Sequence, residues 1–221
     1  SICIFGHAPG EQNKVQASIY TNFDYRYPPD VQFRFVRVRN MKNTRLFRFE
    51  NGSLAYSINA ETMFATNSSF HHNDSVSFSY RLTGSEISNN RIAFAYAYGY
   101  GASPGVLELY NNTFSHNQQG LILGGTQIIA QVYGNRFIDN QNTAIDNRSG
   151  ALFLKGNTFI GNSASEGPGA VKGRINLMHN NLFAGNSSLT SSGTVEGILS
   201  MITGAFSYAK KPHKEIVHNN F

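Results

Sequence analysis

Short stretches in which apolar and polar residues alternate recur along the chain, and glycine and asparagine separate them. The segments "VLELY" at 106–110 and "ALFLK" at 151–155 are examples, and "VQFRFVRVRN" at 31–40 shows that the alternation begins early. Alternation over roughly four to eight residues is typical of a half-buried β-strand. No long stretch has the spacing of an amphipathic helix. The pattern therefore predicts an all-β protein made of many short strands.

A longer period overlies this alternation. An apolar anchor, mostly phenylalanine, returns at steps of 22, 22, 23, 22 and 24 residues. Asparagine stands two positions before the last five anchors, and three positions after every anchor except Ile92. The anchors are Phe70, Ile92, Phe114, Phe137, Phe159 and Phe183. A period in the twenties predicts a solenoid, in which each repeat buries its apolar side against its neighbours.

The composition of each repeat decides between two solenoid architectures. A leucine-rich repeat would show L-x-x-L-x-L and a helical segment, and neither occurs. The repeats instead favour an all-β, single-domain parallel β-helix with coils of about 22–24 residues and roughly three short strands per turn. Coils that stack at about 4.8 Å place equivalent residues above one another. Asparagine columns can then pass hydrogen bonds from coil to coil and tolerate the left-handed backbone of a sharp corner, while phenylalanine columns exclude water.

The regular repeat covers only part of the chain, and its limits predict the domain organisation. Residues 1–30 are expected to form an N-terminal cap or an irregular first coil, and residues 31–221 the β-helix. After Phe183 the next anchor is "HNNF" at 218–221, so a loop insertion is expected within 187–215. Because the chain stops on an anchor, we expect it to belong to a longer protein or to meet an end-to-end partner at its C-terminal coil.

The repeated Phe-x-x-Asn, as in Phe114 to Asn117 and Phe137 to Asn140, is followed by "GPGAV" at 167–171. Together they resemble the FxxN and GGA(I/L/V) pattern of polymorphic outer-membrane proteins and related bacterial surface β-helices. The pectate-lyase-like superfamily of right-handed parallel β-helices, whose members bind or cleave polysaccharides, is similar as well. The resemblance covers roughly residues 65–190. It implies a right-handed helix and a secreted or cell-surface location.

Charge gives the first candidate binding surface. The chain has a net charge of +5, although only 14% of its residues are charged. No acidic residue occurs between Val31 and Phe49. The basic residues of this segment are Arg34, Arg37, Arg39, Lys42, Arg45 and Arg48. On stacked strands they would form a basic stripe for an anionic glycan or protein partner, or else a solvated face that resists edge pairing. No nucleic-acid motif accompanies the stripe, so nucleic acid is not an expected partner.

Other features of the composition leave the compartment open. The single cysteine, Cys3, cannot form an internal disulfide. No apolar run approaches the ~20 residues that would cross a bilayer. Six Asn-x-Ser/Thr sequons occur, at Asn51, Asn67, Asn73, Asn111, Asn147 and Asn186. In a chain so rich in Asn, Ser and Thr, chance explains most of them.

The register of the repeat predicts a second binding surface. Four positions before successive anchors stand Ser88, Tyr110, Tyr133, Lys155 and His179. The last four are the candidate ligand-binding residues, since stacked tyrosines suit sugar rings. Two positions further back stand Glu86 and Glu108. Because these residues would lie one coil apart, they are a candidate acid and base pair. The alternative is that the tyrosines and the glutamates are ordinary solvent-exposed surface residues with no ligand.

A third cluster lies two positions after the anchors and contains His72, His116 and Asp139. His116 and Asp139 fall on adjacent coils, where the carboxylate could orient the imidazole, but no third residue completes a triad or a metal site. The nearest approximation to the calcium and base site of the similar lyases is Asp139, Asp146 and Arg148 with Lys172. We therefore expect no metal and no cofactor.

Three functions remain open on this sequence. The preferred hypothesis is an extracellular or cell-surface binding module, adhesin-like, that recognises a glycan or a protein partner. A polysaccharide lyase or glycoside hydrolase on the same scaffold is the first alternative, with Glu86, Glu108, His116 and Asp139 as its candidate catalytic residues. A structural segment of a filament or large assembly is the second.

Overall fold

The fold was obtained as a computed structural model. It describes residues 2–5, 31–34, 37–97, 104–125, 128–148, 150–173, 175–188 and 216–217. The expected cap at 1–30 and the expected insertion within 187–215 lie almost wholly outside these residues. The described residues contain β-strands and no helix, which confirms the all-β prediction.

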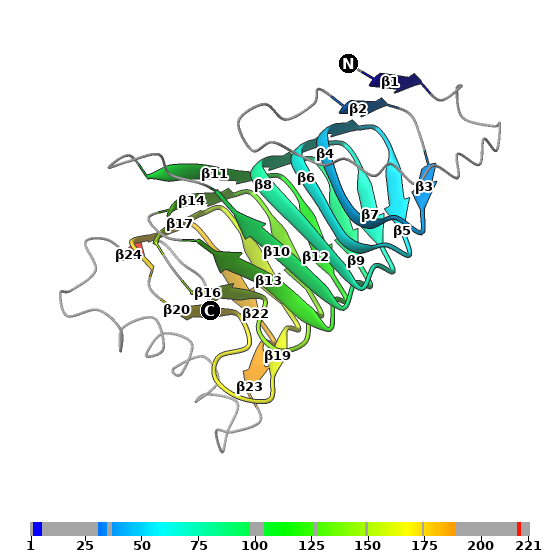
Figure 1. The fold of residues 1–221 in the computed structure, drawn as a ribbon. Coiled ribbons are helices and arrows are strands. Elements are labelled where there is room, and N and C mark those ends of the chain that lie inside the picture. The colour runs from blue at the N-terminus through cyan, green and yellow to red at the C-terminus, as the bar shows by residue number, and fades with distance from the viewer. Residues whose placement is uncertain are drawn as a thin grey trace.

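The strands form three sheets, and every pair of neighbouring strands is parallel (Figure 1). The largest sheet has 14 strands, the second has eight and the third has two. The 14 strands are β1 (Ile2–Phe5), β2 (Val31–Arg34), β4 (Lys42–Glu50), β6 (Ile58–Thr66), β8 (Ser75–Thr83), β10 (Ile92–Tyr96), β11 (Gly105–Tyr110), β13 (Gln119–Gly124), β14 (Ile128–Tyr133), β16 (Ile145–Asn147), β17 (Ala151–Lys155), β20 (Val171–Gly173), β21 (Leu177–His179) and β24 (Ile216–Val217). The eight are β3 (Arg37–Arg39), β5 (Ser53–Ala55), β7 (Ser69–His71), β9 (Glu86–Ser88), β12 (Thr113–Ser115), β15 (Arg136–Ile138), β18 (Thr158–Ile160) and β22 (Leu182–Ala184), and the last two are β19 (Ser163–Ala164) and β23 (Ser187–Ser188).

The chain passes repeatedly between the two larger sheets. Apart from the pair β1 and β2, each described strand therefore pairs with strands one repeat away rather than with its sequence neighbour. We call one such repeat a rung. Rungs lie side by side along one axis, and the chain curls from sheet to sheet between them (Figure 1). The parallel pairing and the asparagine ladders described below are consistent with a parallel β-helix-like solenoid.

Rung architecture changes at β8. From β4 to β9, a nine-residue strand is followed by a three-residue strand in each rung, as in β6 and β7. After β8, the long strand is divided in two. The first half of β8 pairs with β10, which ends at Tyr96, and its second half pairs with β11, which begins at Gly105. Tyr80, in the middle of β8, has a left-handed φ of 72°, and the β6 and β8 register shifts beside it. The predicted three strands per turn therefore hold only for the second half of the protein.

The predicted period of about 22–24 residues is also wrong in the first half, where the long strand is not yet divided in two. Rung lengths measured along one ladder are 16, 17, 27, 23, 22 and 24 residues from Ser57 to Asn186. The residue that pairs with both Phe70 and Phe114 is Ile87, whereas Ile92 begins β10 in the other large sheet. Ile92 lies midway between Phe70 and Phe114 by chance. The two rungs that separate these phenylalanines have 17 and 27 residues, and together they span the same length as two equal steps of 22.

The five phenylalanine anchors lie at the centre of the core, as predicted, and Ile87 takes the place expected for Ile92. In the eight-stranded sheet the central residue of each strand is fully or almost fully buried. The column runs through Val38, Leu54, Phe70, Ile87, Phe114, Phe137, Phe159 and Phe183. The last four rings stack with centroids 4.8–5.0 Å apart and interplanar angles of 5–6°. The rung spacing brings these rings into contact, because each ring occupies the same position on its strand.

Two buried ladders flank the anchor column. In the first, the side-chain amide Nδ2 of each asparagine donates to Oδ1 of the next rung and to the carbonyl oxygen of the anchor one rung before. Asn140 is an example, since its Nδ2 donates to Asn162 Oδ1 and to the Phe114 carbonyl, both at 2.9 Å. This ladder runs through Asn73, Asn90, Asn117, Asn140, Asn162 and Asn186. The second runs through Asn112, Asn135, Asn157 and Asn181. The predicted rung-to-rung amide bonds are confirmed.

The sharp corners, however, are made by the residues next to the ladders. On each side of the three-residue strand one exposed position has a left-handed φ of about 50–65°. Asn67 and Asn111 occupy one corner, and His116 and Asp139 the other. Glycine often takes the same position one rung later because the preceding side chain lies against it. A Cβ on Gly134 would collide with Asn111 Oδ1, and a Cβ on Gly161 would collide with Asp139 Oδ1. The ladder asparagines were thus wrongly expected to make the corners themselves.

Candidate functional site

Two outward-facing columns of the 14-stranded sheet carry the residues expected to bind a ligand. Register places Tyr110 beside Tyr133, Tyr133 beside Lys155, and Lys155 beside His179. The neighbouring column, two residues back on each strand, continues the same surface. We call the whole surface the tyrosine face, and it comprises Glu108, Tyr110, Gln131, Tyr133, Phe153, Lys155, Leu177 and His179.

The two tyrosines form the centre of this face. Their rings stack with centroids 5.5 Å apart and an interplanar angle of 17°, and both are half-buried. The Tyr110 hydroxyl donates to Gln131 Oε1, which lies on the adjacent strand. Burial is the main cause that raises the pKa of Tyr110 and of Tyr133, and the nearby Glu108 carboxylate raises that of Tyr110 further. Both hydroxyls therefore stay protonated at neutral pH and can donate hydrogen bonds.

An ion pair closes one end of the face. Arg81 on β8 donates from Nε and Nη2 to Glu108 Oε2, and Glu108 raises the pKa of the guanidinium through this hydrogen bond. Glu108 Oε1 lies 3.4 Å from the Tyr110 hydroxyl, whose single proton is donated over the shorter distance to Gln131 Oε1. The Glu108 carboxylate is thus paired mainly with the Arg81 guanidinium. Arg81 was missed in the sequence because the irregular rung length hid its register.

The predicted pairing of Glu86 with Glu108 is wrong. Glu86 lies on β9 in the eight-stranded sheet, where its neighbours are Ser69 and Thr113, whereas Arg81 and Gln131 flank Glu108 in the 14-stranded sheet. Ser88, expected beside Tyr110, instead pairs with Ser115. These errors follow from the Ile92 misalignment, which shifted this rung by five residues. The proposed acid and base pair does not exist.

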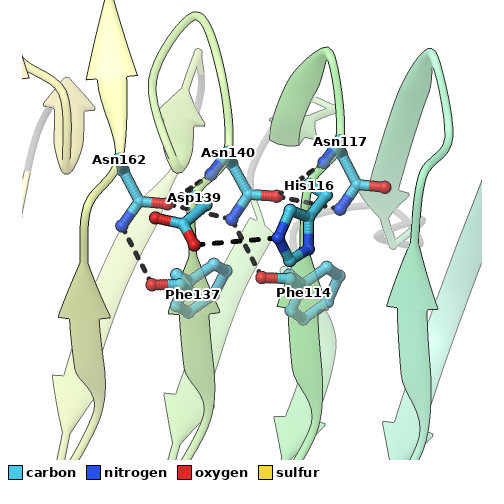
Figure 2. Close-up of polar contacts among 7 residues, drawn as sticks. All are labelled: Phe114, His116, Asn117, Phe137, Asp139, Asn140 and Asn162. Carbon is cyan, nitrogen blue, oxygen red and sulfur yellow. Dashed lines mark hydrogen bonds and ion pairs between the residues drawn. The ribbon is translucent and has the colours of Figure 1, made fainter.

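His116 and Asp139 do lie on adjacent rungs, as predicted (Figure 2). Both occupy left-handed corner positions, and His116 Nε2 is 3.7 Å from Asp139 Oδ2. Figure 2 shows the pair outside the ladder formed by Asn117, Asn140 and Asn162. Both side chains are more than half exposed, and at 3.7 Å the contact is too long for a strong hydrogen bond. His72 occupies the same corner column, two rungs before His116.

The six basic residues expected to form one stripe are divided between two sheets. Arg34, Lys42, Arg45 and Arg48 lie on strands of the 14-stranded sheet, and Arg37 and Arg39 lie on β3 of the eight-stranded sheet. Glu50 pairs with Arg34 at 2.7 Å and approaches Arg48 at 3.7 Å. The single basic stripe is therefore wrong, because β3 belongs to a different sheet from β2 and β4.

The residues nearest to a lyase-type arrangement are also separated. Asp146 pairs with Arg148 at 2.9 Å, and Lys172 lies beside Asp146 in register, but Asp139 is at the corner before β16. Within the described ranges, no group of three or more His, Cys, Asp or Glu residues is placed to hold a metal ion.

The sequons fall into two classes. Asn51, Asn67 and Asn111 are exposed at one corner of the rungs. The other three, at Asn73, Asn147 and Asn186, are buried, and two of them belong to a ladder. Only the corner sequons present an accessible side chain.

Comparison with protein-family models, with curated proteins and with solved structures finds no match for this chain. In the parts of the chain that the structure describes, there is no helix long and apolar enough to span a membrane.

Proposed function

We propose that the chain is a right-handed parallel β-helix, outside the cell or at its surface, and that its tyrosine face binds a glycan. The proposed right-handedness is supported by a general preference: about 98% of crossover connections between parallel strands of one sheet are right-handed. The resemblance of the Phe-x-x-Asn repeat to bacterial surface β-helices and to the pectate-lyase-like superfamily supports the location and the ligand class.

The stacked pair of Tyr110 and Tyr133 is the observation that carries this proposal. Two half-buried rings on adjacent rungs, side by side in register, offer an apolar surface to the flat faces of sugar rings. Gln131, Lys155 and the phenol hydroxyls supply hydrogen-bonding groups beside these rings. A flat face with polar groups at rung spacing suits an extended chain of repeating units.

Binding to a glycan array, followed by affinity measurement on the glycan retained, tests the proposal. We expect Tyr133→Ala to weaken binding about tenfold, because it removes one stacking surface worth ~1.4 kcal/mol. Tyr133→Phe keeps the ring and should remain within about threefold of the original affinity. Ile160→Ala is the matched control, since it truncates an exposed apolar residue on the other sheet.

Salt separates the tyrosine face from the basic residues as the binding surface. Binding through stacked rings should survive raised salt, whereas binding through arginine and lysine should weaken because exposed charges are screened. If Tyr133→Ala binds as tightly as the original chain, the proposal fails.

The same glycan panels, incubated with and without calcium and examined for depolymerisation, distinguish binding from cleavage. Turnover that Glu108→Gln or His116→Ala abolishes would replace the binding module by a lyase or hydrolase. Light scattering on the purified chain addresses the structural alternative, since concentration-dependent growth would indicate end-to-end stacking.

A further inference from the structure

A second polar cluster lies on the eight-stranded sheet, at its N-terminal end. Its members come from three successive rungs and contact one another in sequence. The Arg39 guanidinium lies 5.8 Å from the centroid of the Tyr56 ring, and Tyr56 stacks on His72 with centroids 5.6 Å apart. His72 Nδ1 is 3.0 Å from His71 Nδ1, and His71 Nε2 is 3.0 Å from Ser53 Oγ. We call Arg39, Ser53, Tyr56, His71 and His72 the histidine cluster.

Register explains why residues so far apart in sequence meet here. Arg39, Ala55 and His71 are consecutive neighbours on β3, β5 and β7. Strand alternation directs all three side chains outward, because Val38, Leu54 and Phe70 fill the core. Ala55 is nevertheless only 1% exposed, so the larger side chains around it close over its methyl group.

The contact between the two imidazoles depends on protonation. A hydrogen bond between His71 Nδ1 and His72 Nδ1 needs one nitrogen to donate and the other to accept, so at most one ring can be charged while it persists. Burial is the main cause that lowers the pKa of His71, followed by His72 and Arg39, while Glu86 opposes them. Protonating both rings breaks this bond and places three positive charges together.

The charges around the cluster determine the kind of ligand it suits. Arg37 and Arg39 approach from β3, Ser53 and Tyr56 from β5 and its following corner, and Glu86 from β9. A divalent cation would lie close to Arg39, which repels it. An anion would gain from Arg39 and from each imidazole that takes up a proton.

We propose that the histidine cluster binds an oxyanion, such as a sulfate or a carboxylate group, and that it does so mainly below neutral pH. Arg39 supplies a permanent charge, Ser53 a hydroxyl donor, and His71 and His72 supply Nδ1–H donors once both are protonated. The site lies on a different sheet from the tyrosine face, so it does not depend on the glycan-binding proposal.

Linkage fixes the sign of the pH effect. With no anion bound, the unfolded chain takes up the His71 proton at about pH 6.5, before the folded chain does. Folding stability contributed by this group is therefore lost as pH falls below 6.5. An anion that binds the protonated cluster opposes this trend, because it favours the charged His71 imidazole and so raises the pKa of His71.

NMR titration of the seven imidazoles tests the proposal directly. The titration runs from pH 5 to 8 in sodium sulfate and in sodium chloride of equal ionic strength. We expect sulfate to raise the pKa of His71 by at least about half a unit and to move the imidazole resonances of His72. His116 is the matched control, because it occupies the same corner column and has Asp139 as its neighbour, and sulfate should move its imidazole resonances much less.

Charge removal provides the second arm. Arg39→Gln should abolish most of the sulfate effect, while Arg136→Gln removes an exposed arginine elsewhere on the same sheet and should leave it intact. Repeating the titration with acetate, with a sulfated oligosaccharide and with a carboxylated oligosaccharide separates a free anion from a glycan-borne one.

An equal sulfate shift at His116, or an effect that survives Arg39→Gln, overturns the proposal. Binding of zinc or copper ions that outcompetes sulfate at pH 6 would overturn it as well and identify a metal chelate instead. Tyr133→Ala should leave the sulfate shift unchanged, so the failure of one proposal can be told from the failure of the other.

Discussion

The two halves of the protein use the same cross-rung columns but build them from different residues. Before β8 the rungs are 16–17 residues long, and the anchors include Val38 and Leu54. The ladders there rely on serines such as Ser57 and Ser68. After β8 the rungs have 22–27 residues, and phenylalanines and asparagines fill the same positions. The three-residue strand and its two corners are therefore the constant unit, while the rest of the rung varies in length.

The residue types differ because their hydrogen-bonding capacity differs. A serine such as Ser57 donates once, to the Ala55 carbonyl, and accepts once, from the Met41 backbone N–H. A ladder asparagine has two Nδ2 donors and an acceptor oxygen, so it bonds to the rungs on both sides. In the second half, successive rungs are therefore held by side-chain hydrogen bonds as well as by the backbone hydrogen bonds between strands.

Breaking a ladder should have the largest effect and should differ most between the halves. Asn140→Ala leaves the Phe114 carbonyl and the Asn117 amide groups without their buried partner. We expect a loss of about 3–5 kcal/mol in the free energy of unfolding. Ser57→Ala, in the first half, should lose only about 1–2 kcal/mol.

Urea denaturation measures both variants, with Gln141→Ala as an exposed control that should stay within about 0.5 kcal/mol. Equal losses of unfolding free energy for Asn140→Ala and Ser57→Ala would contradict the view that side-chain ladders stabilise the second half more than the first.

Exchanging anchors between the halves sharpens the comparison further. Phe137→Leu removes a ring stacked between Phe114 and Phe159, and we expect a loss of about 1–3 kcal/mol. Leu54→Phe adds volume to the core of a shorter rung and should cost about the same through overpacking. Thermal unfolding of each variant gives the measurement. A stabilising Leu54→Phe would show that rung length does not set the size of the core.

The junction between the halves should be the least sensitive to a single change. Arg81 on β8 and Glu108 on β11 pair across it, but the arginine is 53% exposed. We expect Glu108→Gln to lose less than about 1 kcal/mol at low salt, and the difference to vanish in 1 M salt. Denaturation at two salt concentrations checks this, with Asp74→Asn as a second exposed ion-pair variant. A salt-independent loss above 2 kcal/mol would mean that the pair holds the two halves together.

The sequence predicted the second half well because its signals repeat at nearly constant spacing. Phe114, Phe137, Phe159 and Phe183 stack as expected, and the asparagines beside them form the predicted ladders. The rungs of the first half could not be predicted, because serine and aliphatic residues are too common to mark a period of 16–17 residues. Ile87 and Ile92 are both apolar, so hydrophobicity could not choose between them.

The candidate sites divide in the same way. The order Tyr110, Tyr133, Lys155 and His179 follows from the regular half. Glu86 was misplaced and Arg81 missed because both precede the long rung. The histidine cluster was not predicted as one site. Arg39 was assigned to the basic stripe and His72 to the cluster with His116, because the short rungs that bring them together with His71 were not apparent in the sequence.

The sequence by itself determined the all-β class, the anchor column and the asparagine ladders from Phe114 onward. These features depend on local alternation and on identical residues returning at one period, and both can be read along a single chain. Only the tertiary structure decided the rung lengths, the split of the basic residues between two sheets, and the contacts of Arg81 with Glu108 and of His71 with His72. Such contacts depend on how many residues each corner holds, and a corner changes length without altering the pattern of the strands around it.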